Sequence, residues 1–370
     1  MESETNSTGD LKSFETFDVE PESTGEKIFA SIKIVIALAG LIGNFTVCLV
    51  TARLKRQNVH ILIVTQAITD LLASLALVLL TLTDIFPLAV PTNAFWGYLY
   101  CFFWKNGVVL FSLFAISTFN LVAISLERYN AILHPISHVY EFSRRKVFVL
   151  AALAWVFGPM MEVTFVIFVN VGVEDGKCLY SDQYEKTRTV KAIGLLIFFW
   201  EYFIPCIIMA FCFTRIIFTL QKREKRWKKM EMPTVSATTT HFATNTENVN
   251  EKETTGNGRP KGTSSSAASI ASKQTRNVTS TLITVFAVYV ICWSTEKFLF
   301  LQYNLGGYID FGGLLYGFAV SMAMLNSACN PIIYALRYDQ YRKELKLVIL
   351  CAGCKHNQPV ASSIQETGQI

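Results

Sequence analysis

Charged residues are scarce in this 370-residue chain: 16% are Asp, Glu, Lys or Arg, whereas 52% are hydrophobic. A chain this apolar is not an ordinary soluble domain, because it has too few charged groups for a surface that faces water. The sequence also has no internal repeat and no nucleic-acid-binding motif. No cleavable signal peptide pattern follows Met1, so we expect the first apolar run to direct the chain to the membrane.

The hydrophobic residues form runs of roughly twenty or more residues, the length that a helix needs to cross about 30 Å of hydrocarbon. Seven runs lie near residues 28–52, 60–86, 100–127, 147–171, 190–220, 277–303 and 311–336. The sequence therefore predicts an all-α membrane protein, a seven-transmembrane helix bundle over residues 28–336. A tail over residues 1–27 precedes the bundle, and residues 337–370 follow it.

Lys and Arg in the short flanks set the expected orientation, because these residues concentrate on the cytoplasmic side. They follow runs one, three and five, at Arg53, Lys55, Arg56, Arg144, Arg145, Lys146, Lys222 and Arg223. Acidic residues dominate the first 27 positions. We expect a multi-pass plasma-membrane protein with its N-terminus outside and its C-terminus inside, and the net charge of +5 reflects this topology. Asn6-Ser7-Thr8 in the outer tail fits an N-glycan acceptor.

Four of the nine cysteines lie outside the cores of the runs. Cys101 opens the third run and Cys178 lies between runs four and five, both on the oxidising side, where a disulfide would pin the outer loop over the bundle. Cys351 and Cys354 follow a cytoplasmic amphipathic segment and suit palmitoylation. Half of a zinc site is the alternative, although with only His356 nearby the ligand count is short.

Residues 221–276 change in composition from basic to rich in Ser, Thr, Asn and Gly. Such a segment cannot bury enough apolar surface to fold alone. We expect a disordered third intracellular loop, a solvated tether whose hydroxyl groups are accessible to kinases.

Glu127 and Arg128 are neighbours at the inner end of the third run. Ionisable groups at the edge of a bilayer are costly, so they mark a functional site or a satisfied structural pair. A local pair would hold the guanidinium group in place, and breaking it would free Arg128. The two residues are therefore a candidate two-state element.

Asp70, Ser117, Asn326, Ser327 and Asn330 are polar residues at mid-depth on three different runs. In hydrocarbon such groups must turn inward and satisfy one another. Oxygen-bearing side chains around one carboxylate suit a hard cation. A water-filled network with a protonated Asp70 is the alternative.

Taken in order, the motifs of this chain resemble those of the rhodopsin-like (class A) G-protein-coupled receptors over nearly its whole length. The motif residues are Gly43, Asn44, Asp70, Glu127, Arg128, Tyr129, Trp155, Pro205, Cys292, Trp293, Asn330, Pro331 and Tyr334. Each motif alone is weak, but together, each in its proper run, they are specific. The resemblance implies a short amphipathic eighth helix from Tyr338 to Leu350.

The resemblance also implies a function: a receptor, not an enzyme, that binds an extracellular ligand and activates a heterotrimeric G protein. Kinases and arrestin are further expected partners, and no cofactor is required. By this resemblance Arg128 is the switch residue, Pro135 and Ile136 match the second inner loop that docks the G protein, and the Asp70 set holds an allosteric Na⁺.

The chain departs from the family pattern at three points. Thr295 stands where run six usually has proline, which predicts a straighter helix, bent mildly if Ser294 and Thr295 bond to carbonyls one turn earlier. Phe213 replaces the run-five tyrosine whose hydroxyl group makes a water-mediated contact to Tyr334 in the family. Cys101 lies 27 residues before Arg128, two more than usual, which predicts a bulge or a shifted helix start.

Two absences narrow the ligand class. Leu110 fills the slot of the aminergic aspartate and Met324 that of the retinal-bearing lysine, which disfavours a monoamine receptor and a light sensor. The outer halves of the runs instead carry Lys105, Glu162, Glu201, Glu296 and Lys297, with Trp104, Gln302, Tyr303 and Tyr316 near the mouth. Either Glu201 pairs with Lys297, or the acids meet a basic group on a ligand, for which we favour a short peptide such as a neuropeptide. The aromatic residues also fit simple packing or interface anchoring.

Other membrane functions leave sequence signatures that this chain lacks. A secondary transporter would show repeated halves with Gly/Pro-broken helices, and an ion channel would show a filter segment. A ligand-independent, scaffold-type receptor and a receptor for a small non-peptide ligand stay open as alternatives.

Overall fold

The computed structural model describes residues 24–54, 57–86, 89–136, 138, 143–169, 171–174, 177–180, 188–231, 263–310 and 313–355. Within these ranges seven helical stretches are long and apolar enough to cross a membrane, as the sequence predicts. They are Lys27–Arg53, Asn58–Ile85, Val108–Leu133, Arg144–Thr164, Lys191–Arg226, Lys273–Asn304 and Leu314–Arg337.

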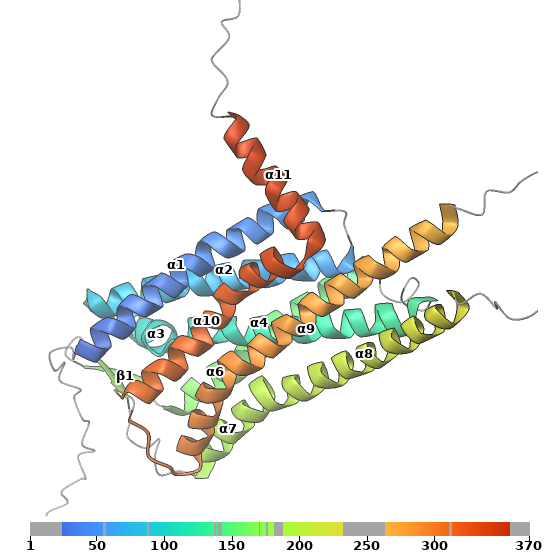
Figure 1. Cartoon of the computed structure of the whole chain (residues 1–370). Coiled ribbons are helices and arrows are strands. Elements are labelled where there is room, and N and C mark those ends of the chain that lie inside the picture. The colour runs from blue at the N-terminus through green and yellow to red at the C-terminus, as the bar shows by residue number, and fades with distance from the viewer. Residues whose placement is uncertain are drawn as a thin grey trace, which may run out of the picture.

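The helices that contain these stretches pack side by side as one bundle (Figure 1). They are α1 (Thr24–Arg53), α2 (Asn58–Ile85), α4 (Val108–Leu133), α6 (Arg144–Val169), α7 with α8 (Arg188–Phe198 and Ile204–Glu231), α9 (Thr263–Asn304) and α10 (Leu314–Arg337). A π-helical segment, η3 (Phe199–Phe203), joins α7 to α8. The central helix is α4, whose side chains are buried along most of its length.

The start of the third membrane helix differs from the predicted run over residues 100–127. A short helix α3 (Ala94–Leu99) and a π-helical segment η1 (Tyr100–Lys105) come first. The chain then breaks at Gly107, whose positive φ of 69° favours glycine, and α4 begins at Val108. The extra residue per π-turn and this break explain the long spacing between Cys101 and Arg128. The predicted shifted start is therefore confirmed.

The predicted run over residues 100–127 was also too short at its inner end. It stopped at Glu127, the first charged residue, but the helix continues to Leu133 because Glu127 and Arg128 neutralise each other inside it. A similar correction applies to the predicted tether over residues 221–276. Helix α8 extends to Glu231 and α9 begins at Thr263, so both margins of that segment are helical. The basic margin after Gln221 is rich in Lys, Arg and Glu, which are strong helix formers.

The eighth helix is present as α11 (Asp339–Lys355). It turns away from the end of α10 (Figure 1), and Tyr338 at the turn has an extended conformation. Tyr341, Leu345 and Val348 pack it against the core, whereas Leu347, Ile349 and Leu350 are exposed. This division between two faces is typical of a helix that lies along a membrane surface.

Two prolines free backbone carbonyls that distant side chains then bind. Proline has no N–H, so the carbonyl four residues earlier loses its helical partner. Before Pro205 this is the carbonyl of Glu201, which accepts a hydrogen bond from the Tyr289 hydroxyl at 3.1 Å. Before Pro331 it is that of Ser327, which accepts a bond from the Asn44 amide at 3.0 Å. Both bonds tie neighbouring helices together.

Glycines allow close helix contacts at two further points. A Cβ atom on Gly43 would lie 2.8 Å from the Pro331 ring, and one on Gly158 would lie 2.7 Å from the backbone nitrogen of Ile116. Small residues at such crossings let helix backbones approach within a membrane. Gly43 therefore sets the contact of α1 with α10, and Gly158 sets that of α6 with α4.

Candidate ligand site and cytoplasmic switch

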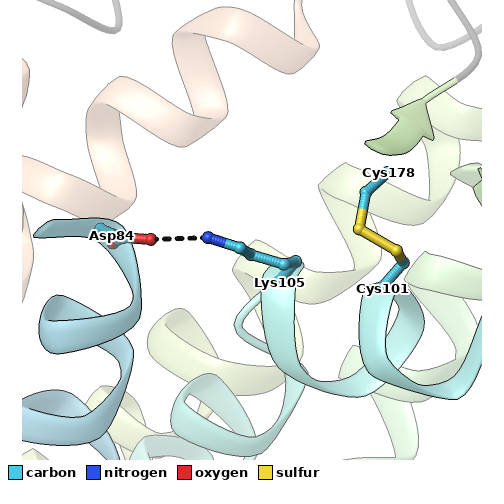
Figure 2. The surroundings of a disulfide bond; sticks show 4 residues. All are labelled: Asp84, Cys101, Lys105 and Cys178. Carbon is cyan, nitrogen blue, oxygen red and sulfur yellow. Dashed lines mark hydrogen bonds and ion pairs between the residues drawn. A yellow bond between two sulfur atoms is a disulfide. The ribbon is translucent and has the colours of Figure 1, made fainter. Parts of the chain in front are cut away.

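A β-hairpin lies at the outer end of the bundle, formed by β1 (Val171–Glu174) and β2 (Lys177–Tyr180). Its antiparallel register pairs Val173 with Cys178. Cys178 forms a disulfide with Cys101 of η1, with 5.6 Å between the two Cα atoms (Figure 2). The predicted pairing is confirmed, and it fixes the hairpin to the start of the third membrane helix.

We expect Cys101→Ser or Cys178→Ser to lower the free energy of unfolding by about 2–5 kcal/mol, because the bridge restrains the unfolded chain. The double variant should be little worse than either single one, since both remove the same bond. Thermal unfolding of the purified protein and its density at the cell surface measure the effect. Additive losses in the double variant would contradict the assignment.

Lys105 lies apart from the other predicted ligand-site charges. Its ammonium group pairs with Asp84 of α2 at 3.1 Å, near the disulfide (Figure 2). Trp104 donates to the hydroxyl group of Thr83 at 3.3 Å. Both side chains therefore bind α2, because the π-helical η1 changes the direction of the side chains that precede α4. Asp84 gave no signal in the sequence apart from its position at the end of run two.

The other four predicted charges converge inside the outer half of the bundle. The Lys297 ammonium of α9 lies 3.1 Å from the Glu201 carboxylate of η3 and 3.6 Å from that of Glu296. Glu162 of α6 interacts with Glu201 and with Lys297. The predicted pairing of Glu201 with Lys297 is confirmed, and three carboxyl groups surround one ammonium group.

Lys297 is deeply buried, with only 7% of its side chain exposed. Its ammonium group lies 5.1 Å from the centre of the Trp293 ring and 5.9 Å from that of Phe300, within reach of cation–π attraction. The Tyr316 side chain interacts electrostatically with the Glu296 carboxyl group. Gln302 is exposed beyond this cluster, and its carbonyl accepts a bond from Gly307. Of the predicted mouth residues, Tyr316 therefore reaches the charges.

A small cavity lies beside the ion pair. Its volume is about 10 Å³, enough for one water molecule. It is lined by Glu201, Lys297, Trp293, Phe111, Phe114, Ala115 and Thr118. The last four lie on α4 at the spacing i, i+3, i+4, i+7 of one helix face. Sequence reasoning missed them, because nearly every residue of this run is apolar.

A polar network joins α2, α4 and α10 at mid-depth. The Asp70 carboxylate accepts bonds from the Ser117 hydroxyl at 2.9 Å and the Asn330 amide at 2.8 Å. Ser327 also lies near this carboxylate, but its hydroxyl group forms no hydrogen bond among the described residues. Asn326 is buried, and its Oδ1 atom has no hydrogen-bond partner among the described residues. Four of the five predicted residues therefore meet at one carboxylate.

Gln66 is a member of this network that sequence reasoning missed. Its amide donates to both Asp70 oxygens, at 3.3 and 3.2 Å, and to Ser117. Its carbonyl accepts a bond from Asn120 at 2.9 Å. The signal was an amide one helical turn before Asp70 in an apolar run. The oxygen atoms of the residues around Asp70 suit a hard cation, while Gln66 competes for the same carboxylate.

The predicted local pair of Glu127 and Arg128 is present. The Arg128 guanidinium binds both carboxylate oxygens of Glu127, through Nε and, at 2.6 Å, through Nη2. His138 lies 3.2 Å from the same carboxylate, a partner that sequence reasoning missed. Glu127 is fully buried, and Tyr129 packs against His134 and Phe211. Adjacent helical positions meet here because the arginine side chain is long enough to fold back.

Among the predicted activation residues of runs five to seven, Thr295 is half-buried, and the buried ones are Pro205, Phe213, Trp293, Asn330 and Pro331. Ser294 donates to the Val290 carbonyl at 2.5 Å, so that part of the predicted back-bonding in run six is confirmed. Phe213 packs on Phe286 of α9, with ring centres 5.6 Å apart. Trp293 packs on Phe114 of α4. Helix α9, which contains run six, continues without a break past Thr295.

Aromatic residues pack together at the end of the bundle that carries Glu127 and Arg128. The rings of Tyr334 and Tyr341 lie 6.2 Å apart, and the Tyr338 hydroxyl lies 2.6 Å from Nε2 of His60. Burial raises the pKa of Tyr341 to about 12 and also raises that of Tyr338, so both phenols are neutral near pH 7. The predicted glycan site at Asn6 and the side chains of Cys351 and Cys354 lie outside the described residues.

The fold has seven membrane helices, with a buried ion cluster at one end and the Glu127–Arg128 pair at the other. This arrangement is that of a seven-transmembrane receptor. A family model for 7 transmembrane receptors of the rhodopsin family matches residues 43–334. The chain therefore belongs to the rhodopsin family of G-protein-coupled receptors. Its partners by class are an extracellular ligand and a G protein, and it is not an enzyme.

Individual relatives are distant. Neuropeptide receptor npr-1 of Caenorhabditis elegans is 25% identical over 339 residues, covering 85% of this chain and 71% of the relative. The D(1A) dopamine receptor of Didelphis virginiana is 26% identical over 375 residues, covering 91% and 75%. The crystal structure of squid rhodopsin matches with a TM-score of 0.67 at 17% identity, covering 93% of this chain and 90% of that one.

Proposed function

We propose that this receptor lies in the plasma membrane with its N-terminus outside and binds a short extracellular peptide. The ion cluster carries the proposal: Glu162, Glu201 and Glu296 surround one ammonium group, that of Lys297. Three acids exceed one base, and unbalanced charge within a membrane is costly. A basic group on a ligand would supply the missing positive charge.

The orientation is supported from both ends of the bundle. The Cys101–Cys178 disulfide requires an oxidising compartment, which lies outside the cytosol. Basic residues such as Arg53 and Lys146 lie at the opposite end. An epitope tag at the N-terminus should be stained on intact cells, and one at the C-terminus only after permeabilisation.

The inner end suits a protein partner. Ile136 is 78% exposed beside Pro135, close in sequence to the Glu127–Arg128 lock. A docked protein can bury this apolar side chain, which favours its binding at this end. We propose that the G protein docks here and replaces Glu127 as the partner of Arg128, and that kinases and arrestin act on the same side.

A peptide ligand is favoured over a monoamine for two reasons. The neuropeptide receptor npr-1 is among the relatives, and Leu110 occupies the position where aminergic receptors of this family carry an aspartate. A dopamine receptor is also among the relatives, so an amine is the second candidate ligand. The cavity of about 10 Å³ must widen for either ligand, and the basic group then pairs with the acids that Lys297 does not balance.

A library of secreted peptides, applied to cells that express this chain with G-protein dissociation as the readout, tests the proposal. Each basic residue of an active peptide is then neutralised, in the parent and in Glu296→Gln. We expect neutralisation to weaken the parent response by about tenfold but to have less effect in the variant, because coupled groups are not additive. A response to monoamines but to no peptide would overturn the proposal, as would full signalling without ligand.

We also propose an allosteric Na⁺ held by Asp70, Ser117, Asn326, Ser327 and Asn330. An ion bound only in the inactive arrangement shifts the population toward it. Agonist affinity should therefore fall as Na⁺ replaces a bulky organic cation at constant ionic strength. Gln66→Ala should enlarge this effect, because it frees the carboxylate from the competing amide. An unchanged sodium dependence in Asp70→Asn would place the ion elsewhere.

A further inference from the structure

A cleft of about 670 Å³ lies at the cytoplasmic end, between α9 and α11. Four cationic side chains line it: Lys273 from α9, and Arg342, Lys343 and Lys346 from α11. Its one acidic lining residue, Asp339, is hydrogen-bonded to Arg342. No described carboxylate forms an ion pair with any of the three lysines. The cleft therefore has a strong positive charge that the described chain leaves unbalanced.

The base of the cleft is held in place by Asn277 of α9. Its amide donates to the Arg337 carbonyl at 2.8 Å, and its Oδ1 atom accepts from the Asp339 backbone at 2.9 Å. One side chain thereby joins α9 to the turn between α10 and α11. The cationic groups on the two helices are held at the two sides of one hollow.

The mouth of the cleft has the composition of a membrane interface. Lys343, Lys346, Leu347 and Leu350 follow one another at i, i+3, i+4 and i+7, so they share one face of α11. Leu347 is 50% exposed and Leu350 is 64% exposed. Tyr341, Leu345 and Val348 occupy the opposite, packed face. Lysines beside exposed leucines are typical of a helix that lies among lipid headgroups.

We propose that this cleft binds the phosphorylated inositol headgroup of an anionic lipid of the inner leaflet. Several ammonium groups and a guanidinium group match several phosphates, and a cavity of this volume suits a small ligand. The exposed leucines favour a lipid over a soluble phosphate or a phosphorylated peptide. Because the headgroup contacts both α9 and α11, it holds their inner ends together. The proposal rests on the orientation proposed above.

The lipid proposal is tested on the purified full-length receptor, without a ligand or a G protein. A negative result would therefore count against lipid binding alone and not against the proposed receptor function. The probes are phosphatidylcholine vesicles with phosphatidylinositol bisphosphate, or with phosphatidylserine at equal total charge. The test variant is Lys343→Gln/Lys346→Gln. The matched control is Lys222→Gln/Lys225→Gln, which removes two exposed lysines from α8. Equal thermal unfolding of the variants shows that both fold.

The parent and the control should prefer the phosphoinositide vesicles, and the test variant should bind them about tenfold more weakly. Equal binding to phosphatidylserine at matched charge would overturn the proposal, as would an equal loss in the control. Binding of soluble inositol phosphates without retention of the vesicles would identify a free-phosphate site and overturn the lipid assignment. Stronger competition by a phosphorylated peptide than by soluble headgroup would overturn it too.

Discussion

Lys297→Met is expected to remove most of the folded receptor from the cell surface. The variant leaves Glu201, whose side chain is 5% exposed, without its ammonium partner inside the bundle. Removal of one member of a buried ion pair costs about 3–5 kcal/mol, because an uncompensated charge remains. That cost is a large part of the stability of a typical protein. Thermal unfolding in detergent and surface density measure the effect.

Lys105→Met is the matched control. It breaks an ion pair with the same N–O distance, 3.1 Å, but Asp84 is 52% exposed at the surface. Exposed pairs contribute about 0–1 kcal/mol, so this variant should remain near the parent. The double variant Glu201→Gln/Lys297→Met should recover part of the stability that Lys297→Met loses, because neither charge remains in the bundle. Equal effects of Lys297→Met and Lys105→Met would show that burial does not govern the pair.

Arg128→Ala is expected to abolish G-protein activation while the receptor still reaches the surface, because the buried Glu127 keeps His138 as a partner at 3.2 Å. The guanidinium group binds Glu127 through two nitrogens, and an exposed partner can reach it only when that lock opens. Coupling between two sites typically amounts to about 5–150-fold in affinity, so its loss is easily measured. Nucleotide exchange on purified G protein, with saturating agonist, is the readout. Exchange at parental rates would remove Arg128 from the switch.

Glu127→Gln provides the opposite change at the same lock. The neutral amide holds the guanidinium less strongly than a carboxylate does, so ligand-independent exchange should rise. Arg128→Lys should not restore the parent, because an ammonium group cannot make the bidentate contact. His138→Ala should raise exchange less than Glu127→Gln, since it removes only one of the partners of Glu127.

The activation route also depends on the departures from the family pattern. Thr295 leaves α9 with its helical hydrogen bonds, and Phe213 packs against Phe286 without a hydroxyl group to offer to Tyr334. A straight helix resists the outward movement that a proline kink eases. Both features favour the closed arrangement in which the Glu127–Arg128 lock is observed.

The sequence by itself determined the features that depend on neighbouring residues or on run length. Apolar runs fixed the number and order of the membrane helices, since each crossing needs a minimum length. The pair at Glu127 and Arg128 followed from adjacency in the chain. The Cys101–Cys178 bridge followed from topology, because both residues lie at the same end. Four residues of the Asp70 set followed from the rule that polar groups in hydrocarbon satisfy one another.

Only the tertiary structure decided which faces of the helices meet. Lipid-facing side chains of α1 and α2 are as apolar as their core, so the periodicity that identifies a buried face in water is weak here. For that reason Gln66 and the α4 face with Phe111 and Phe114 were missed, whereas His138 was missed because it lies beyond the end of α4. The π-helical η1 turned Lys105 toward Asp84, a rotation that composition does not reveal. Contacts between helices depend on their rotation and depth, which are set by packing across the whole bundle.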